Sequence, residues 1–162
     1  MLGSFAVGKT SLVKRFVEGR FDDSYLSTIG VKISRKSVEF AADDLKINLI
    51  VWDLAGGDEF LRNNAGYLRG AAGALIICDL TRPQTLRTAE NYAHQIRTIN
   101  PDSSIVLLGN KCDLTNEREI SDEDLQGVAD AFNGCVYFLS SAKTGENVEE
   151  AFSLLAEQFK AA

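Results

Sequence analysis

The chain has 162 residues, 45% of them apolar, which suffices to bury one compact core and is too short for two domains of ordinary size. Its formal net charge of −6 argues against a nucleic-acid-binding protein, so any phosphate that it binds must be held by a local site. The three cysteines are widely spaced and odd in number, and the longest apolar run is too short to span a bilayer, which together favour a cytoplasmic protein with reduced thiols.

The first element predicted along the chain is an amphipathic helix. Its apolar face lies within residues 12–17, and Gly19 is well placed to end it. A more polar extended segment follows at residues 31–40, and a turn at 43–44 joins it to an apolar run at 47–52. We read this pair as an antiparallel hairpin at the edge of a sheet.

Three further apolar runs, residues 74–78, 105–108 and 136–139, have the length and branching of buried strands. Helical patterns separate them. One of these helices is expected to begin at Ser121, where Asp124 can complete a capping box. The last helix is expected to bury four apolar side chains, Val148, Ala151, Phe152 and Leu155.

Strands that alternate with helices at this spacing predict an α/β fold. We expect one domain over residues 1–162, with a mostly parallel six-stranded sheet, one antiparallel edge strand and helices on both faces. Ligands of such sheets bind at the carboxyl ends of the strands. Only Met1 and Leu2 precede the first motif, so we expect that the first strand is largely absent and that the natural chain extends several residues upstream.

The segment GSFAVGKT, residues 3–10, matches the phosphate-loop pattern G-x-x-x-x-G-K-[ST] and leads directly into the first helix. Its glycines let backbone N–H groups turn toward a phosphate, and the helix N-terminus adds positive potential. Lys9 is expected to bridge the β- and γ-phosphates, and the Thr10 hydroxyl to ligate Mg²⁺. The alternative is a glycine-rich turn before an ordinary helix. The residues assigned to nucleotide binding here are Gly3, Ser4, Phe5, Ala6, Val7, Gly8, Lys9, Thr10 and Ser11.

A second motif, Asn110, Lys111 and Asp113, follows the strand predicted at residues 105–108 and therefore lies on the same rim. A carboxylate at Asp113 can accept from N1–H and the 2-amino group of guanine, a donor pair that adenine lacks. We expect Asn110 to tie this loop to the phosphate loop, and the stem of Lys111 to cover the base. Taken alone, such a motif could also be a polar turn.

Two weaker motifs complete the set. Residues 141–143 follow another predicted strand, and we expect the Ala142 N–H to reach the guanine O6, with Ser141 beside it and the Lys143 stem packed near the base. Asp53 follows the strand at 47–52 and can hold magnesium. The expected magnesium ligands are Thr10, Thr28 and Asp53.

The N–H of Gly56 is expected to reach a γ-phosphate, and the Thr28 hydroxyl to ligate magnesium beside it. Both Thr28 and Gly56 would lose a partner on hydrolysis, which is the basis of a switch. The residues assigned to catalysis are Lys9, Thr28, Gly56 and Gly57.

With these motifs in this order and spacing, the chain resembles the Ras superfamily of small GTPases, and its Rab branch most closely. The Rab likeness lies in STIGV at 27–31, WD at 52–53, YLRGA at 67–71 and DLT at 79–81. The resemblance implies a Ras-like G domain of the P-loop NTPase class that binds GTP or GDP with Mg²⁺. It also implies effector, exchange-factor and activating proteins that bind residues 25–33 and 56–70.

The resemblance assigns further residues as well. It places Phe21 edge-on to the guanine, although a plain hydrophobic anchor fits its sequence context equally well. Ile29, Trp52 and Tyr67 match effector-facing positions, for which a core role is the competing interpretation. Neither terminus carries a lipidation signal, so we expect membrane association only through a lipidated tail outside these residues.

The chain departs from the family at two positions that matter for catalysis. Gly57 stands where the family has its water-orienting glutamine, and glycine has no side chain to align the attacking water. Phe5 stands at a phosphate-loop position that is often small, where it would crowd an incoming arginine. Asp58 or Glu59 could replace the missing amide, although acids at a helix start are usually there for its dipole. Nucleotide binding needs neither altered position.

The sequence therefore predicts a GTPase switch with slow hydrolysis. A GTP-binding interaction module with little or no hydrolysis is the alternative, favoured by Gly57 and Phe5. A P-loop kinase is disfavoured because Asn110 and Asp113 serve base recognition and no acceptor site is visible.

Overall fold

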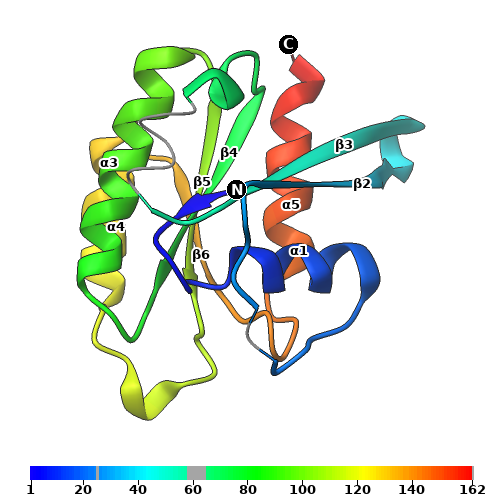
Figure 1. The fold of residues 1–162 in the computed structure, drawn as a ribbon. Helices are drawn as coiled ribbons and strands as arrows, with labels where there is room; N and C mark the ends of the chain where they lie inside the picture. Colours follow the sequence, from blue (N-terminus) through cyan, green and yellow to red (C-terminus); the bar gives the residue numbers. More distant parts are fainter. Residues whose placement is uncertain (25, 58–64, 162) are drawn as a thin grey trace.

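Helices cover both faces of a central parallel sheet in the computed structural model, which describes residues 1–24, 26–57 and 65–161 (Figure 1). Within these residues the sheet has the order β1-β4-β5-β6, and every neighbouring pair is parallel. The strands are β1 (Leu2–Gly3), β4 (Gly73–Asp79), β5 (Ser104–Asn110) and β6 (Val136–Ser140). This arrangement confirms the α/β class with a mostly parallel sheet.

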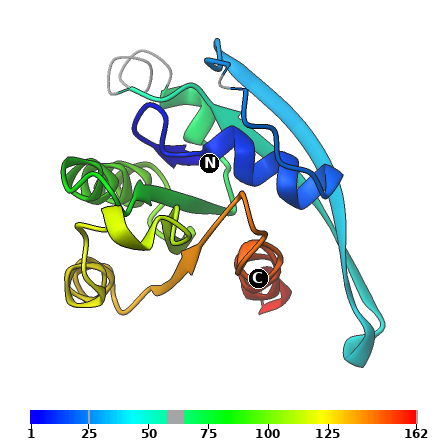
Figure 2. The same ribbon diagram turned by 90° about the horizontal axis from the view of Figure 1, so that it is seen from below.

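Two pairs of helices enclose the sheet, with α3 and α4 on one face and α1 and α5 on the other (Figure 2). Successive residues of a strand point to opposite faces, so Ile76 packs in the cluster beneath α3 while Leu75 packs in the cluster beneath α1 and α5. Phe16 of α1 stacks on Phe152 of α5 with ring centroids 3.9 Å apart, which fixes these two helices against each other. The helices are α1 (Lys9–Glu18), α3 (Gln84–Ile99), α4 (Asp122–Ala131) and α5 (Val148–Glu157), and the short 3₁₀ helices are η1 (Ala41–Asp43), η2 (Ala65–Leu68), η3 (Thr115–Glu117) and η4 (Gln158–Ala161).

The predicted helix ends are confirmed. Gly19 follows α1 with φ of 69° and donates its N–H to the Arg15 carbonyl at 3.0 Å. At the start of α4 the Ser121 Oγ accepts from the Asp124 N–H at 3.1 Å, and the Asp124 carboxylate accepts from the Ser121 N–H at 2.8 Å. The four apolar side chains expected beneath the last helix are all buried.

The predicted edge hairpin is also present. It consists of β2 (Val31–Phe40) and β3 (Leu45–Leu54), antiparallel from the pair Val31–Leu54 to the pair Phe40–Leu45. In Figure 1 it reaches far beyond the parallel strands. Its inner face packs through Val38 and Val51 against the cluster of α1 and α5.

The expected single six-stranded sheet is divided in two. Among the described residues, β2 and β3 form a sheet of their own, separate from the four parallel strands. The two residues of β1 pair with Ile76 and Ile77 of β4, and no ladder between β1 and β3 is present among the described residues. A hydrogen bond from the Met1 ammonium to the Trp52 carbonyl, 2.8 Å long, joins the two sheets at this point.

Candidate functional site

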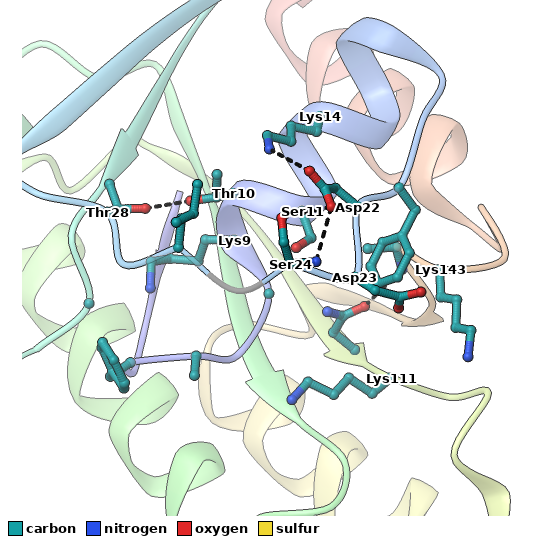
Figure 3. Close-up of a pocket in the computed structure, with 18 of the residues that line it drawn as sticks. Lys9, Thr10, Ser11, Lys14, Asp22, Asp23, Ser24, Thr28, Lys111 and Lys143 are labelled. Carbon is teal, nitrogen blue, oxygen red and sulfur yellow. Dashed lines mark hydrogen bonds and ion pairs between the residues drawn. The ribbon is translucent and has the colours of Figure 1, made fainter.

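A cavity of about 340 Å³ lies at the carboxyl end of the parallel strands. Figure 3 shows the side chains that surround it, contributed by α1, by the segment before β2 and by the loops after β5 and β6. The structure thus brings most of the sequence-predicted residues into one place. Those that line the cavity are Phe5, Ala6, Gly8, Lys9, Thr10, Ser11, Phe21, Thr28, Gly56, Asn110, Lys111, Asp113, Ala142 and Lys143.

The remaining predicted residues lie outside this lining. Gly3, Ser4, Val7, Asp53, Gly57 and Ser141 are not part of the cavity wall. Sequence reasoning missed six residues that are, of which Lys14 could have been found because it lies one helical turn beyond Ser11. The six are Lys14, Asp22, Asp23, Ser24, Leu26 and Leu114.

The phosphate loop turns from β1 into α1 with its helix end uncapped. Gly8 at the helix start has φ of 103°, and as a glycine it offers no side chain to cap the first N–H groups of α1. A Cβ on Gly8 would lie 2.3 Å from the Asn110 side-chain nitrogen, so only glycine fits there. Free N–H groups and the helix dipole together make this end suitable for an anion.

Lys9 is held over the loop as a buried cation. Its Nζ donates to the carbonyls of Gly3 and Ser4, at 2.9 Å each, and the residue is only 6% exposed. Burial lowers the pKa of Lys9 from 10.5 to about 8, an effect that the Asp53 carboxylate opposes and Arg82 reinforces. The ammonium is therefore charged at neutral pH but poorly compensated, which favours an anion beside it.

Three oxygen-bearing side chains meet beneath this lysine. The Thr10 hydroxyl donates to Asp53 Oδ2 at 2.5 Å and lies 2.6 Å from the Thr28 hydroxyl. Asp53 is fully buried, and its Oδ1 has no hydrogen-bond partner among the described residues. Hydroxyl and carboxylate oxygens are the ligands that Mg²⁺ prefers, so these residues fit a magnesium ion next to a phosphate.

At the other end of the cavity, the loop at residues 110–113, predicted to recognise the base, is hydrogen-bonded to the phosphate loop. The Asn110 side-chain amide donates to the Val7 carbonyl at 2.9 Å, which confirms the link expected between the two loops. The Asp113 carboxylate accepts from the Ser141 hydroxyl at 2.6 Å. The Ala142 N–H, expected to face guanine, donates to the Asn110 side-chain oxygen in a long 3.3 Å contact. The backbone of this loop is also fixed by Arg15, whose Nε donates to the Ala142 carbonyl at 2.8 Å.

Lys111 pairs with a carboxylate that sequence reasoning did not include in the site. Its Nζ lies 2.6 Å from Oδ2 of Asp79, the last residue of β4, while its side chain lines the cavity. The same oxygen accepts from Arg82 Nε at 2.9 Å. Burial raises the pKa of Asp79, but the hydrogen bonds from Lys111 and Thr81 outweigh it, so the carboxyl stays ionised with a pKa below its usual range.

Of the two departures from the family pattern, Phe5 lines the cavity and Gly57 directly follows the cavity-lining Gly56. Phe5 is 54% exposed, and Gly56 packs so closely on it that a Cβ at Gly56 would lie 2.7 Å from the Phe5 nitrogen. Gly57 has φ of 130°, and among the described residues no atom lies within 4 Å of a Cβ built at this position. Asp58 and Glu59, the possible replacements, lie outside the described residues.

A model of the Ras family matches residues 1–161 of the chain. The chain belongs to the Ras family. Its relatives include Rab-22A of Mus musculus, 37% identical over 153 residues, which cover 94% of this chain and 77% of that protein. Rab-13 of Bos taurus is 37% identical over 158 residues, which cover 96% of this chain and 76% of that protein. Rab-8A of Gallus gallus is 35% identical over 162 residues, which cover 99% of this chain and 77% of that protein. The suspected Rab-like small GTPase is thereby confirmed at the level of the family.

Three apolar side chains of this Ras-family chain, suggested for partner contact, lie on its surface. Ile29 is 93% exposed, and Trp52 and Tyr67 are each about two-fifths exposed with ring centroids 5.8 Å apart. Their competing interpretation as core residues is therefore wrong. Part of the predicted partner surface, residues 25 and 58–64, lies outside the described residues. Among those that are described, no helix has the length and apolar character needed to cross a membrane.

Proposed function

We propose that this Ras-family protein is a guanine-nucleotide switch that binds GTP or GDP with Mg²⁺ and hydrolyses GTP slowly. The observation that carries the proposal is one cavity that joins an uncapped helix N-terminus and the buried Lys9 at one end to the Asp113 carboxylate at the other. The helix N-terminus and the Lys9 ammonium suit phosphates, and the Asp113 carboxylate suits a base with two adjacent donors.

Guanine specificity rests on Asp113. Its carboxylate is oriented by the Ser141 hydroxyl, and this fixed orientation leaves acceptor capacity for N1–H and the 2-amino group. The Lys111 and Lys143 stems offer apolar cover for the two faces of the base. The Ala142 N–H is bound only at 3.3 Å and can be shared with the guanine O6.

Magnesium would be held by Thr10 and Thr28, with Asp53 reaching it through water, and would neutralise phosphate charge during hydrolysis. Chelation with EDTA should then accelerate GDP release by about a hundredfold, since a metal–phosphate contact is worth several kcal/mol. The release of a fluorescent GDP analogue, followed with and without EDTA, measures this effect. In Asp53→Asn the acceleration should shrink to less than about threefold, whereas Asp102→Asn, on an exposed loop, should keep it in full. An equal response in Asp53→Asn and the wild type would remove Asp53 from the site.

Slow hydrolysis follows from the absence of a water-orienting side chain at Gly57. We expect GTP loaded on the purified protein with Mg²⁺ to persist for hours, at a rate of about 10⁻⁴ s⁻¹ or less, which is the order quoted for the related Ras without assistance. Single-turnover hydrolysis, with the bound nucleotide identified by chromatography before and after incubation, measures this rate and tests the whole proposal. Conversion to GDP within minutes would contradict it, because an unrecognised group would then orient the water.

The cause of the slow rate can be tested separately. Because Gly57 has φ of 130°, any side chain there changes the backbone, so the matched control for Gly57→Gln is Gly57→Ala, both combined with Phe5→Gly. The glutamine variant should hydrolyse GTP about tenfold faster than the alanine variant. Equal rates would mean that the missing amide does not limit hydrolysis.

A second candidate function is a GTP-binding interaction module that does not hydrolyse its nucleotide. The exposed Phe5 favours it, because a benzyl group at the edge of the cavity would hinder an arginine supplied by an activating protein. Effector, exchange-factor and activating proteins are proposed to bind residues 25–33 and 56–70, which include Thr28 and Gly56. GTP that stays intact for days would favour this module over the switch.

A further inference from the structure

A buried carboxylate at the end of β4 connects the two ends of the cavity. Asp79 accepts four hydrogen bonds and is fully buried. Thr81 supplies two to Oδ1, from its N–H at 3.0 Å and its hydroxyl at 2.7 Å. Oδ2 receives Arg82 Nε at 2.9 Å and Lys111 Nζ at 2.6 Å. A buried carboxylate is stable only with such compensation, so Asp79 holds both cations in fixed places.

The far side of the Arg82 guanidinium binds the phosphate loop. Its Nη2 donates to the Phe5 carbonyl at 3.0 Å, across a sequence separation of 77 residues. The planar guanidinium can hold Asp79 and Phe5 at once because its donors point in fixed directions, which a lysine ammonium on a flexible stem cannot reproduce.

Binding the Phe5 carbonyl also determines where the next N–H points. The chain has no cis peptide among the described residues, and in a trans peptide the C=O and the following N–H point in opposite directions. The Phe5 carbonyl shares its peptide plane with the N–H of Ala6, a residue that lines the cavity. Asn110 acts in the same way two residues further along, since its hydrogen bond to the Val7 carbonyl orients the Gly8 N–H.

We infer that Arg82, held by Asp79, is a positioning residue that orients the Ala6 N–H toward a bound phosphate and couples the phosphate loop to Lys111. This inference rests on the proposed nucleotide binding and adds residues that the phosphate-loop and base motifs do not contain. Arg82 need not touch the nucleotide, because it acts through the peptide between Phe5 and Ala6.

The test uses the GDP-bound full chain with Mg²⁺ and two measurements. The first is the release rate of a fluorescent GDP analogue, which should rise about tenfold in Arg82→Ala, the scale of one hydrogen bond to a charged group. Arg82→Lys should also release faster than the wild type, because an ammonium cannot hold both partners. Arg87→Ala, which removes an exposed arginine from α3, the helix that follows Arg82, should release at the wild-type rate.

The second measurement separates positioning from a loss of structure. In a ¹H–¹⁵N spectrum the Ala6 amide should move upfield in both Arg82 variants, while the Gly8 amide, oriented by Asn110, should keep its position. Asp79→Asn should release GDP at least as fast as Arg82→Ala, and adding Arg82→Ala to it should cause no further rise, because both changes break one chain of contacts.

Three results would overturn the inference. If wild-type protein holds GDP and both Arg82 variants release it at the wild-type rate, the contact does not position the loop. If release is faster but the Ala6 amide does not move, Arg82 acts through general charge or stability. If the wild type binds no GDP, the proposed function fails first and this inference fails with it.

Discussion

Replacing Asp113 with asparagine should change the base that the protein prefers. Guanine presents two donors to the Asp113 carboxylate, whereas xanthine presents one donor and one carbonyl oxygen, which match the amide of asparagine. The Ser141 hydroxyl, 2.6 Å from Asp113 Oδ1, fixes the orientation of the side chain, so the mismatch cannot be relieved by rotation without losing this bond. We expect GDP affinity to fall by about a thousandfold or more and xanthosine diphosphate to become the better ligand.

Competition titrations of GDP and xanthosine diphosphate against a fluorescent nucleotide measure this reversal. Asp102→Asn removes one exposed carboxylate and is the matched control, which should bind GDP as the wild type does. An Asp113→Asn variant that still prefers guanine over xanthine would show that the base is read elsewhere.

Replacing Lys9 with methionine should abolish nucleotide binding and at the same time stabilise the nucleotide-free protein. Burial lowers the pKa of Lys9 from 10.5 to about 8, and Asp53 only partly opposes this, so its charge destabilises the empty fold by on the order of 3 kcal/mol at pH 7. Because the pKa of this base is lower in the folded state, the cost is fully present below pH 8 and is lost as the pH rises toward 10.5. Methionine removes the charge but leaves the carbonyls of Gly3 and Ser4 to water, so we expect a net gain of about 1 kcal/mol.

Denaturant unfolding without nucleotide, at pH 7 and again at pH 10, measures the difference. Lys9→Met should exceed the wild type in unfolding free energy at pH 7, and the two should approach each other at pH 10. Lys32→Met, at an exposed position of β2, should show no such dependence on pH. A Lys9→Met protein less stable than the wild type at both values would show that the hydrogen bonds of Lys9 outweigh its burial.

Much of the candidate site could be predicted because its residues follow strands. Lys9, Asn110 and Ala142 come just after apolar runs or open a helix, and parallel strands bring such positions to one rim. The capping box at Ser121 and the helix end at Gly19 were predictable for a similar reason, since both depend on contacts between near neighbours in sequence.

The rest depends on contacts that no local pattern encodes. Arg82 binds a carbonyl 77 residues away, and Asp79 is an ordinary strand-end aspartate until the fold places Lys111 beside it. The division of the sheet was also missed, because it depends on which strands meet in the fold and not on the character of any one strand. Depressed pKa values such as that of Lys9 likewise follow from burial, which exists only in the folded chain.

The β2–β3 hairpin connects the two residues proposed to sense the γ-phosphate, Thr28 and Gly56. Thr28 precedes β2 and Gly56 follows β3, and the Ala55 N–H donates to the Gly30 carbonyl at 2.9 Å where the two strands meet. The ladder continues without interruption from Val31 and Leu54, so displacement at one sensor is carried to the other across paired backbone. We therefore expect Thr28 and Gly56 to be released from the phosphate together and not one at a time. A partner protein that binds near either residue would then distinguish the two states of both.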